Sequence, residues 1–169
     1  MSEIIREIEI FAEGVNTKFS IELMEAIPDK EFNKKEKFKL LSPLILSTYK
    51  DHNGKPSQYY LRYYDDINLI TRVFNQNLFN KYKLIFNKEY EGEPLKFEWD
   101  TDFINRRLSQ NKRITKKISI PKPKNLIINL IGNVAPFYLT GNPELIKIGY
   151  DCGFGQNNSL GFGMAETIN

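Results

Sequence analysis

The amino-acid sequence predicts an α+β protein built around a ferredoxin-like βαββαβ domain. Apolar residues that recur three or four positions apart from Ile67 to Ile85 predict one long amphipathic helix. The triplet Asn142-Pro143-Glu144 combines an N-cap, a proline at the first helical position and an early acidic residue, and it predicts the start of a second helix. Segments typical of strands flank both helices. The expected order over residues 37–169 is therefore strand, helix, strand, strand, helix, strand.

The N-terminal region has a different character. Residues 4–11 alternate between apolar and polar side chains and predict a strand, and residues 16–27 fit either a strand or a short helix. The charged stretch 29–37 is typical of a loop or linker. We therefore expect a strand region with a linker over residues 1–36, interpreted as the remnant of a preceding ferredoxin-like domain, and the main domain over 37–169.

The main domain begins with residues 38–48, the strongest strand candidate, in which Pro43 indicates an edge position or a bulge. Asn53-Gly54 predicts a type I′ hairpin that returns the chain into a strand at 58–64. Asp65 or Asp66 then caps the long helix. The buried stripe of this helix is predicted to consist of Ile67, Ile70, Phe74, Leu78, Tyr82 and Ile85.

The second half of the domain is expected to hold more strands than helices. We expect a loop at 88–94, a turn at 121–124 and strands at 95–100, near 117–120, at 126–131 and at 162–168. Residues 133–140 are predicted to continue the strand before them after a kink at Gly132. The second helix is short and stops by Gly153, because glycine commonly ends a helix.

Composition limits the classes of function. The 169 residues and 19.8 kDa provide enough chain for one full core or two very small ones. The sequence has one cysteine, Cys152, and one histidine, His52, so neither an internal disulfide nor a zinc site of His and Cys ligands is expected. No apolar run is long enough for a membrane helix, and the first residues do not resemble a signal peptide. We expect a cytoplasmic protein without a metal or other cofactor.

Charge is distributed unevenly along the chain. The net charge is only +3, yet the stretch from Phe103 to Pro143 contains no acidic residue. Its eight cationic residues are Arg106, Arg107, Lys112, Arg113, Lys116, Lys117, Lys122 and Lys124. Such a strip beside an acidic remainder predicts a polyanionic partner. A solvated, lysine-rich hairpin without a ligand is the alternative.

Glycines cluster near the C-terminus. Five of the ten glycines fall between Gly149 and Gly163, with the spacing G-x-G-x5-G-x-G over 153–163. The residues between the pairs, 156–159, carry amide and hydroxyl groups that are able to bind phosphate and ribose oxygens. Dinucleotide-binding loops and P-loops precede a helix, whereas this loop follows one, so neither is predicted. A helix C-cap followed by a bulged strand entry would explain only part of the glycine content.

The segment from Gly153 to Gly163, followed by Met164, resembles the C-terminal signature of the CRISPR repeat-processing endoribonucleases, within the wider RAMP group. Three segments agree with that family in the same order. They are Lys37-Phe38-Lys39-Leu40-Leu41-Ser42-Pro43, the pairs Asn77-Leu78 and Lys81-Tyr82, and Phe137-Tyr138-Leu139-Thr140-Gly141-Asn142-Pro143-Glu144-Leu145. The resemblance spans about residues 37–169.

The resemblance implies a ferredoxin-like, RNA-recognition-motif-like domain that binds CRISPR repeat RNA. It implies metal-independent cleavage, in which a ribose 2′-hydroxyl attacks the adjacent phosphate and leaves a 2′,3′-cyclic phosphate. Members commonly carry the catalytic histidine in a first domain, and no position of this sequence matches it. His52 lies in a predicted hairpin tip, where an exposed loop histidine is the ordinary reading and a catalytic group the exceptional one.

Residues expected to contact RNA fall into two groups. The first group is the glycine loop: Gly153, Gly155, Gln156, Asn157, Asn158, Ser159, Gly161 and Gly163. The second group is the cationic strip: Arg106, Arg107, Lys112, Arg113, Lys116 and Lys117. The alternatives to an endoribonuclease are a catalytically inactive RNA-binding module and a structural RAMP subunit. A homodimer and association with other CRISPR complex subunits are the further partner hypotheses.

Overall fold

The computed structural model describes residues 7–12, 15–20, 29–123 and 126–168, which divide into two compact units, 1–30 and 31–169. In the first unit, β1 (Glu7–Ala12) and β2 (Val15–Ser20) form an antiparallel hairpin in the register Glu7↔Ser20. The predicted first strand is confirmed over 7–11. The second segment is a strand up to Ser20, and residues 21–27 lie outside the described part.

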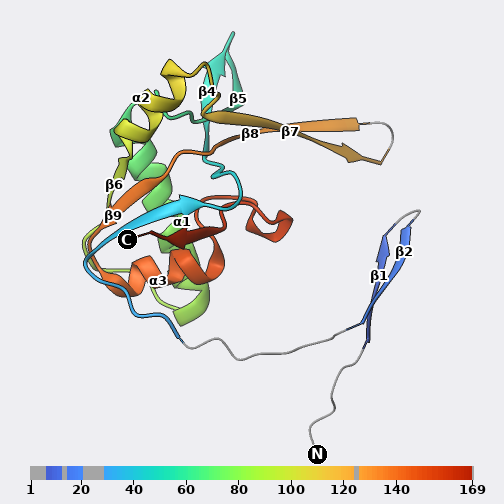
Figure 1. Ribbon diagram of the computed structural model, residues 1–169, viewed down its shortest axis with the longest axis horizontal. Helices are drawn as coiled ribbons and strands as arrows, with labels where there is room; N and C mark the ends of the chain where they lie inside the picture. The colour runs from blue at the N-terminus through green and yellow to red at the C-terminus, as the bar shows by residue number, and fades with distance from the viewer. Residues whose placement is uncertain (1–6, 13–14, 21–28, 124–125, 169) are drawn as a thin grey trace, which may run out of the picture. The chain divides into compact units, whose positions relative to one another are not determined.

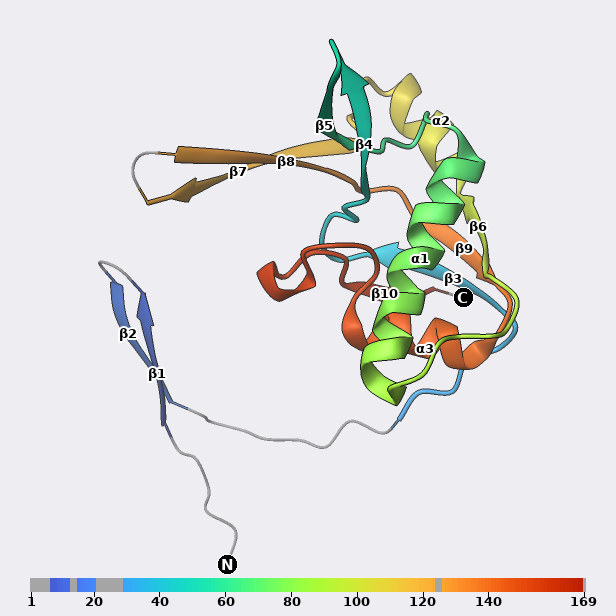
Figure 2. The same ribbon diagram turned by 180° about the vertical axis from the view of Figure 1, so that it is seen from behind.

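The second unit is built on one antiparallel sheet in the order β10-β3-β9-β6 (Figure 1). The strands are β3 (Lys35–Leu40), β6 (Lys96–Trp99), β9 (Phe137–Thr140) and β10 (Ala165–Thr167). Helices α1 (Ile67–Phe86) and α3 (Pro143–Cys152) cover one face of this sheet (Figure 2). Among the strands of this sheet, α1 lies between the central strand β3 and the outer strand β6, and α3 lies between the central strand β9 and the outer strand β10; neither pair is adjacent. The predicted ferredoxin-like βαββαβ fold is confirmed.

The core lies between the sheet and the two helices, and aromatic rings fill its centre. Phe38 of β3, Phe74 of α1 and Phe137 of β9 are fully buried. Phe154, just after α3, meets Phe38 with ring centroids 4.9 Å apart and Phe137 at 5.3 Å, both edge to face. The segment after α3 is therefore tied into the core by a ring at its start.

The cap and stripe of α1 agree with most of the prediction. The Asp66 side chain accepts a hydrogen bond from the Asn68 backbone N–H and caps the helix. The middle of the expected stripe is buried: Ile70, Phe74, Leu78 and Tyr82. Its two ends were predicted wrongly, because Ile67 and Ile85 lie in the first and last turns of the helix and are 41% and 51% exposed.

One predicted strand is in fact two elements. The stretch 38–48 does not continue through Pro43, because β3 ends at Leu40 and the chain leaves the sheet. Leu44 forms an isolated bridge to Asn133, and β4 (Ser47–His52) then pairs with β5 (Lys55–Tyr60). The Asn53-Gly54 hairpin turn is confirmed by positive φ angles of 56° and 76°. The stretch 29–37 was expected to be a loop throughout, but β3 begins at Lys35.

The connection from β6 to β9 contains elements that the sequence reading partly missed. Helix α2 (Thr101–Ser109) was not predicted; Asp100 caps it, and only Ile104 is buried. It leads into β7 (Thr115–Lys122) and β8 (Leu126–Asn133), a long antiparallel hairpin. Residues 133–140 do not simply continue β8. That strand ends at Asn133, residues 134–136 belong to no strand, and the chain then enters the central sheet as β9.

Candidate nucleic-acid interface

The segment Gly153–Gly163, here called the glycine loop, has buried ends and an exposed middle. Gly153, Phe154 and Gly155 are buried at one end and Phe162 and Gly163 at the other. Residues 157 and 159–161 are exposed around a single 3-10 turn, η1 (Asn158–Leu160). The loop therefore leaves the core, exposes a short polar turn, and returns.

Two of its glycines are needed because backbones approach closely. A Cβ at Gly163 would lie 1.8 Å from the carbonyl oxygen of Phe154, and one at Gly155 would lie 2.5 Å from that of Ile45. Gly161 differs, since its φ is +82° but a Cβ there would meet nothing within 4 Å. The contact at Gly163 brings the two arms of the loop together, as the bond from the Phe154 N–H to the Gly163 carbonyl shows at 2.8 Å, whereas the contact at Gly155 brings the entry arm against the chain at Ile45.

Two of the polar side chains of the loop hold it in shape. Asn158 Nδ2 donates to the carbonyl oxygens of Phe154 (3.2 Å) and Phe162 (2.9 Å). Gln156 Oε1 accepts from the Ser47 hydroxyl at 2.7 Å and so ties the loop to the start of β4. The remaining polar side chains of the turn, Asn157 and Ser159, are exposed. Among the described residues of the loop, these two are the donors best placed to meet a ligand.

Lys81 of α1 anchors the entry arm of the loop from inside. Its half-buried Nζ donates to the carbonyl oxygens of Gly153 and, at 3.1 Å, Gly155. Burial lowers the pKa of the Lys81 ammonium to about 8. The sequence analysis includes this lysine in a family helix segment but gives it no role. Residue spacing along the chain does not reveal that a side chain of α1 reaches the glycine loop.

The cationic strip occupies α2, the segment after it, and β7. Arg106 and Arg107 lie in the last turn of α2, Lys112 and Arg113 follow the helix, and the remaining pair is on β7. Five of these side chains line one cleft together with Thr115 and Val134: Arg107, Lys112, Arg113, Lys116 and Lys117. Arg106 is not in this cleft.

The geometry of Arg107 shows how the cleft is built. Its Nη2 donates to the Arg113 carbonyl at 3.4 Å, its Nε is buried without a partner in the described part of the chain, and its guanidinium lies 5.8 Å from the Phe103 ring. Arg107 thus links the end of α2 to the segment that leads into β7. Because the Nε is buried, a phosphate in this cleft would be bound by the Nη donors of the guanidinium.

The glycine loop and the β7–β8 hairpin are packed together. Phe162 at the exit of the loop forms a small buried cluster with Leu130 of β8 and with Ile45, which precedes β4. Ile118 and Ile120 of β7 pack against this cluster. Both segments project from the same side of the sheet in both views (Figures 1 and 2). The exit arm of the glycine loop therefore packs against the hairpin whose strand β7 carries Lys116 and Lys117.

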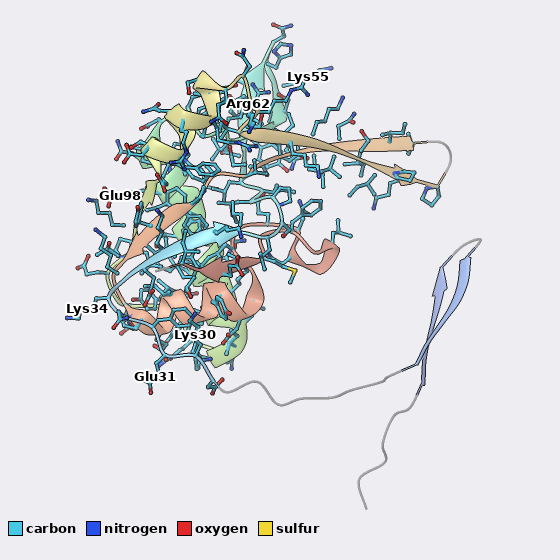
Figure 3. All side chains as sticks on the ribbon, in the orientation of Figure 1. Lys30, Glu31, Lys34, Lys55, Arg62 and Glu98 are labelled. Carbon is cyan, nitrogen blue, oxygen red and sulfur yellow. The ribbon has the colours of Figure 1, made fainter. Side chains whose placement is uncertain are left out.

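His52 lies apart from the cleft, at the exposed tip of the β4–β5 hairpin. Lys55, its partner across the turn, extends away from the body of the domain (Figure 3). Lys50 on the same hairpin lies 3.4 Å from the centre of the Tyr59 ring. Nothing in this arrangement orients the imidazole as an acid or base. Within the described ranges no group of His, Cys, Asp and Glu side chains is arranged to hold a metal ion.

Fold and site together define a ferredoxin-like domain with a glycine loop between its second sheet-covering helix and its last strand. Residues 27–167 match the family model of the CRISPR-associated protein Cas6, C-terminal part, and the chain belongs to that family. In the part of the chain that the structure describes, no helix has the length and apolar character to cross a membrane.

Curated relatives agree with this assignment. The chain is 28% identical over 163 residues to the CRISPR-associated endoribonuclease Cas6 1 of Methanocaldococcus jannaschii, covering 90% of this chain and 52% of the relative. It is 30% identical over 166 residues to Cas6 2 of the same organism, covering 92% and 64%. The chain spans about half the length of several curated relatives that it matches.

Two solved structures share the fold. A Cas6-related protein from Pyrococcus furiosus superimposes with a TM-score of 0.66 at 22% identity, over 90% of this chain and 55% of that one. A RAMP protein that binds different RNA substrates superimposes with a TM-score of 0.67 at 23% identity, over 95% and 59%.

Proposed function

We propose that this chain binds CRISPR repeat RNA, with the glycine loop and the cationic cleft against the sugar–phosphate backbone. One observation carries the proposal: the exposed turn Asn157–Gly161 belongs to a loop whose exit arm packs on the acid-free hairpin. Cations of the cleft would supply salt-dependent phosphate contacts, and the turn would supply neutral donors for ribose and phosphate oxygens. The likeness to Cas6 endoribonucleases supports RNA as the polyanion.

The activity proposed for the whole protein is metal-independent cleavage of the repeat by 2′-hydroxyl attack. This chain would contribute binding and orientation of the RNA, which reduces the entropic cost of bringing the hydroxyl in line with the phosphate. The exposed position of His52 supports the second candidate, a binding module without catalysis in this chain. We place the protein in the cytoplasm, where it would meet the RNA, either as a homodimer or with other CRISPR complex subunits.

The salt dependence of binding tests the electrostatic part of the proposal. Neutralising Arg106, Arg107, Lys112 and Arg113 to glutamine should weaken binding of the host's repeat RNA and flatten the plot of log affinity against log salt. Each lost phosphate contact reduces that slope by about 0.7 for single strands, so four contacts reduce it by about 3. The matched control neutralises four lysines outside the strip: Lys34, Lys83, Lys88 and Lys96.

Both variants lose four positive charges, so a purely nonspecific effect of net charge would move them equally. An equal change in slope for the two variants, or no binding by the unaltered chain, would refute the proposed RNA site. Incubation of the unaltered chain with the same RNA in EDTA distinguishes an endoribonuclease from a module that only binds. Products with 2′,3′-cyclic phosphate ends show that the chain cleaves, and binding without products favours the module that only binds.

A further inference from the structure

Lys81 occupies an unusual position behind the glycine loop. It lies on α1, yet its ammonium donates hydrogen bonds to the carbonyls of Gly153 and Gly155. These two residues flank Phe154, whose ring packs the start of the loop into the core. Both carbonyls belong to the entry arm, just beyond the C-terminus of α3. Carbonyls at a helix C-terminus attract a cation, which accounts for the direction in which the side chain points.

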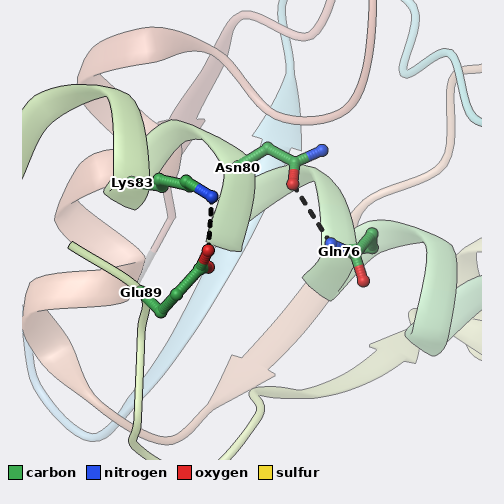
Figure 4. Close-up of polar contacts among 4 residues, drawn as sticks. All are labelled: Gln76, Asn80, Lys83 and Glu89. Carbon is green, nitrogen blue, oxygen red and sulfur yellow. Dashed lines mark hydrogen bonds and ion pairs between the residues drawn. The ribbon is translucent and has the colours of Figure 1, made fainter. Parts of the chain in front are cut away.

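The charge of Lys81 has no ionic partner. No carboxylate of the described residues pairs with it, whereas Lys83, two residues further on, pairs with Glu89 on the helix surface (Figure 4). The glycine loop contains no charged residue. On α3, Lys147 and Asp151 pair with each other at 2.9 Å. Burial is the largest influence on the pKa of Lys81, and the electrostatic interaction with Cys152 raises that pKa by less than burial lowers it.

A half-buried cation in this setting opposes folding when it is charged. Burial lowers the pKa of Lys81 from 10.5 to about 8, so the unfolded chain holds the proton more tightly than the folded one. The contribution of Lys81 to stability therefore increases as pH rises from about 8 toward 10.5. At neutral pH the ammonium is charged in spite of this cost. An anion bound at the loop would offset it.

We propose that Lys81 is a positioning residue for the glycine loop, and that binding of an RNA phosphate at the loop is coupled to retention of the proton on the Lys81 ammonium. The inference rests on the proposed function, because it requires that RNA meets this loop. The two carbonyl bonds fix the entry arm, and the positive charge behind it attracts the phosphate. Deprotonation weakens both effects at once.

The coupling has a calculable size. If bound phosphate restores the ordinary proton affinity of the lysine, affinity stays constant below pH 8 and falls above it, by about tenfold between pH 7 and pH 9. Linkage also requires uptake of about half a proton per RNA bound at pH 8. A lysine that only supported the fold would give neither effect.

The experiment measures affinity from pH 7 to pH 9.5 for the host's repeat RNA with 2′-O-methyl riboses, which prevents cleavage. The unaltered chain should lose about tenfold in affinity by pH 9. Lys81→Arg should remain nearly flat, because the guanidinium stays charged at these pH values. Lys81→Met should bind weakly at every pH, and Lys83→Met and Cys152→Ser should follow the unaltered chain.

The outcomes separate the two levels of the argument. If the unaltered chain does not bind this RNA at pH 7, the proposed function fails. If it binds but its affinity is flat from pH 7 to 9.5, or if Lys81→Arg shows the same decline, the coupling is wrong. If Cys152→Ser abolishes the decline, the thiol and not the lysine is responsible. Lys81→Arg keeps the test valid should Lys81→Met fail to fold, and calorimetry in buffers of different ionisation enthalpy checks the proton uptake.

Discussion

Alanine substitutions at two glycines of the same loop measure how much of its glycine content is dictated by packing. Gly161 and Gly163 have nearly the same backbone angle, with φ of +82° and +74°. An alanine at either position meets the left-handed penalty of about 1–2 kcal/mol. A Cβ at Gly161 would meet nothing within 4 Å, whereas one at Gly163 would lie 1.8 Å from the Phe154 carbonyl oxygen and 2.8 Å from its carbon.

Subtracting one variant from the other cancels the shared penalty and leaves the effect of close approach. Gly161→Ala should lower the free energy of unfolding by about 1 kcal/mol. Gly163→Ala must separate the two arms of the loop and should cost roughly 3 kcal/mol more, near the upper end for overpacking. Urea unfolding followed by tryptophan fluorescence and by circular dichroism measures both. Equal losses for the two variants would show that the arms are not in contact, and the description of the loop would be wrong.

Three further predictions concern side chains that hold neighbouring parts together. Asn133→Ala should lower the free energy of unfolding by about 2–4 kcal/mol, because it leaves the Leu61 carbonyl and the Tyr63 N–H unsatisfied. In the same denaturant titration, Asn129→Ala on the exposed part of the hairpin should change the free energy of unfolding by less than about 0.5 kcal/mol. Burial alone would raise the pKa of Asp100, but bonds from Lys37 of β3 and from the α2 backbone lower the pKa below 3.8. Its stabilisation is therefore present above pH 3.8 and lost as the pH falls through the folded-state pKa. Asp100→Asn should destabilise the chain at pH 7 by about 1 kcal/mol, and the difference from the unaltered chain should shrink as the solution is acidified through that pKa. Asn158→Ala should reduce both thermal stability and RNA affinity, since its two bonds shape the loop, whereas Ser159→Ala should reduce affinity alone.

The parts of the fold that could be predicted are those whose signals are local. The cap at Asp66, the hairpin turn at Asn53-Gly54 and the helix start at Asn142 each depend on residues within one turn, and each is confirmed. Helix α2 was missed because only Ile104 is buried, so the helix has almost no apolar stripe to detect. The caps of a nine-residue helix are visible in the sequence only once the helix itself is suspected.

Errors in the strands arose where tertiary contacts override local pattern. The apolar run 38–48 fits one strand by composition, but Pro43 lies where the exit arm of the glycine loop meets the chain, and its carbonyl accepts from the Gly163 N–H at 3.1 Å. Leu44 then bonds to Asn133, more than 80 positions away. No window along the sequence contains both partners, so the division of the run into β3 and β4 could not be foreseen.

The site shows the same division between local and long-range information. Composition identified the glycine loop and the cationic strip, but treated every glycine and every amide of the loop as a prospective ligand contact. In the structure, Gly155 and Gly163 allow backbones to touch, and Gln156 and Asn158 direct their amides inward. In the proposed RNA complex these four residues would act only through the shape they impose, so their substitution should lower stability and affinity together.

Preorganisation explains why a binding loop would use its polar residues in this way. A flexible polar turn would lose conformational entropy on meeting RNA, whereas a turn already held by Asn158, Gln156 and Lys81 has met that cost during folding. The exposed side chains of Asn157 and Ser159 would then project from a fixed frame, while the exit arm of the loop packs on the hairpin that carries part of the cationic strip. Affinity would come mainly from the cationic strip, and the turn would fix the register along the RNA. Loss of Lys81 should therefore reduce the preference for one binding register on the RNA as well as the affinity.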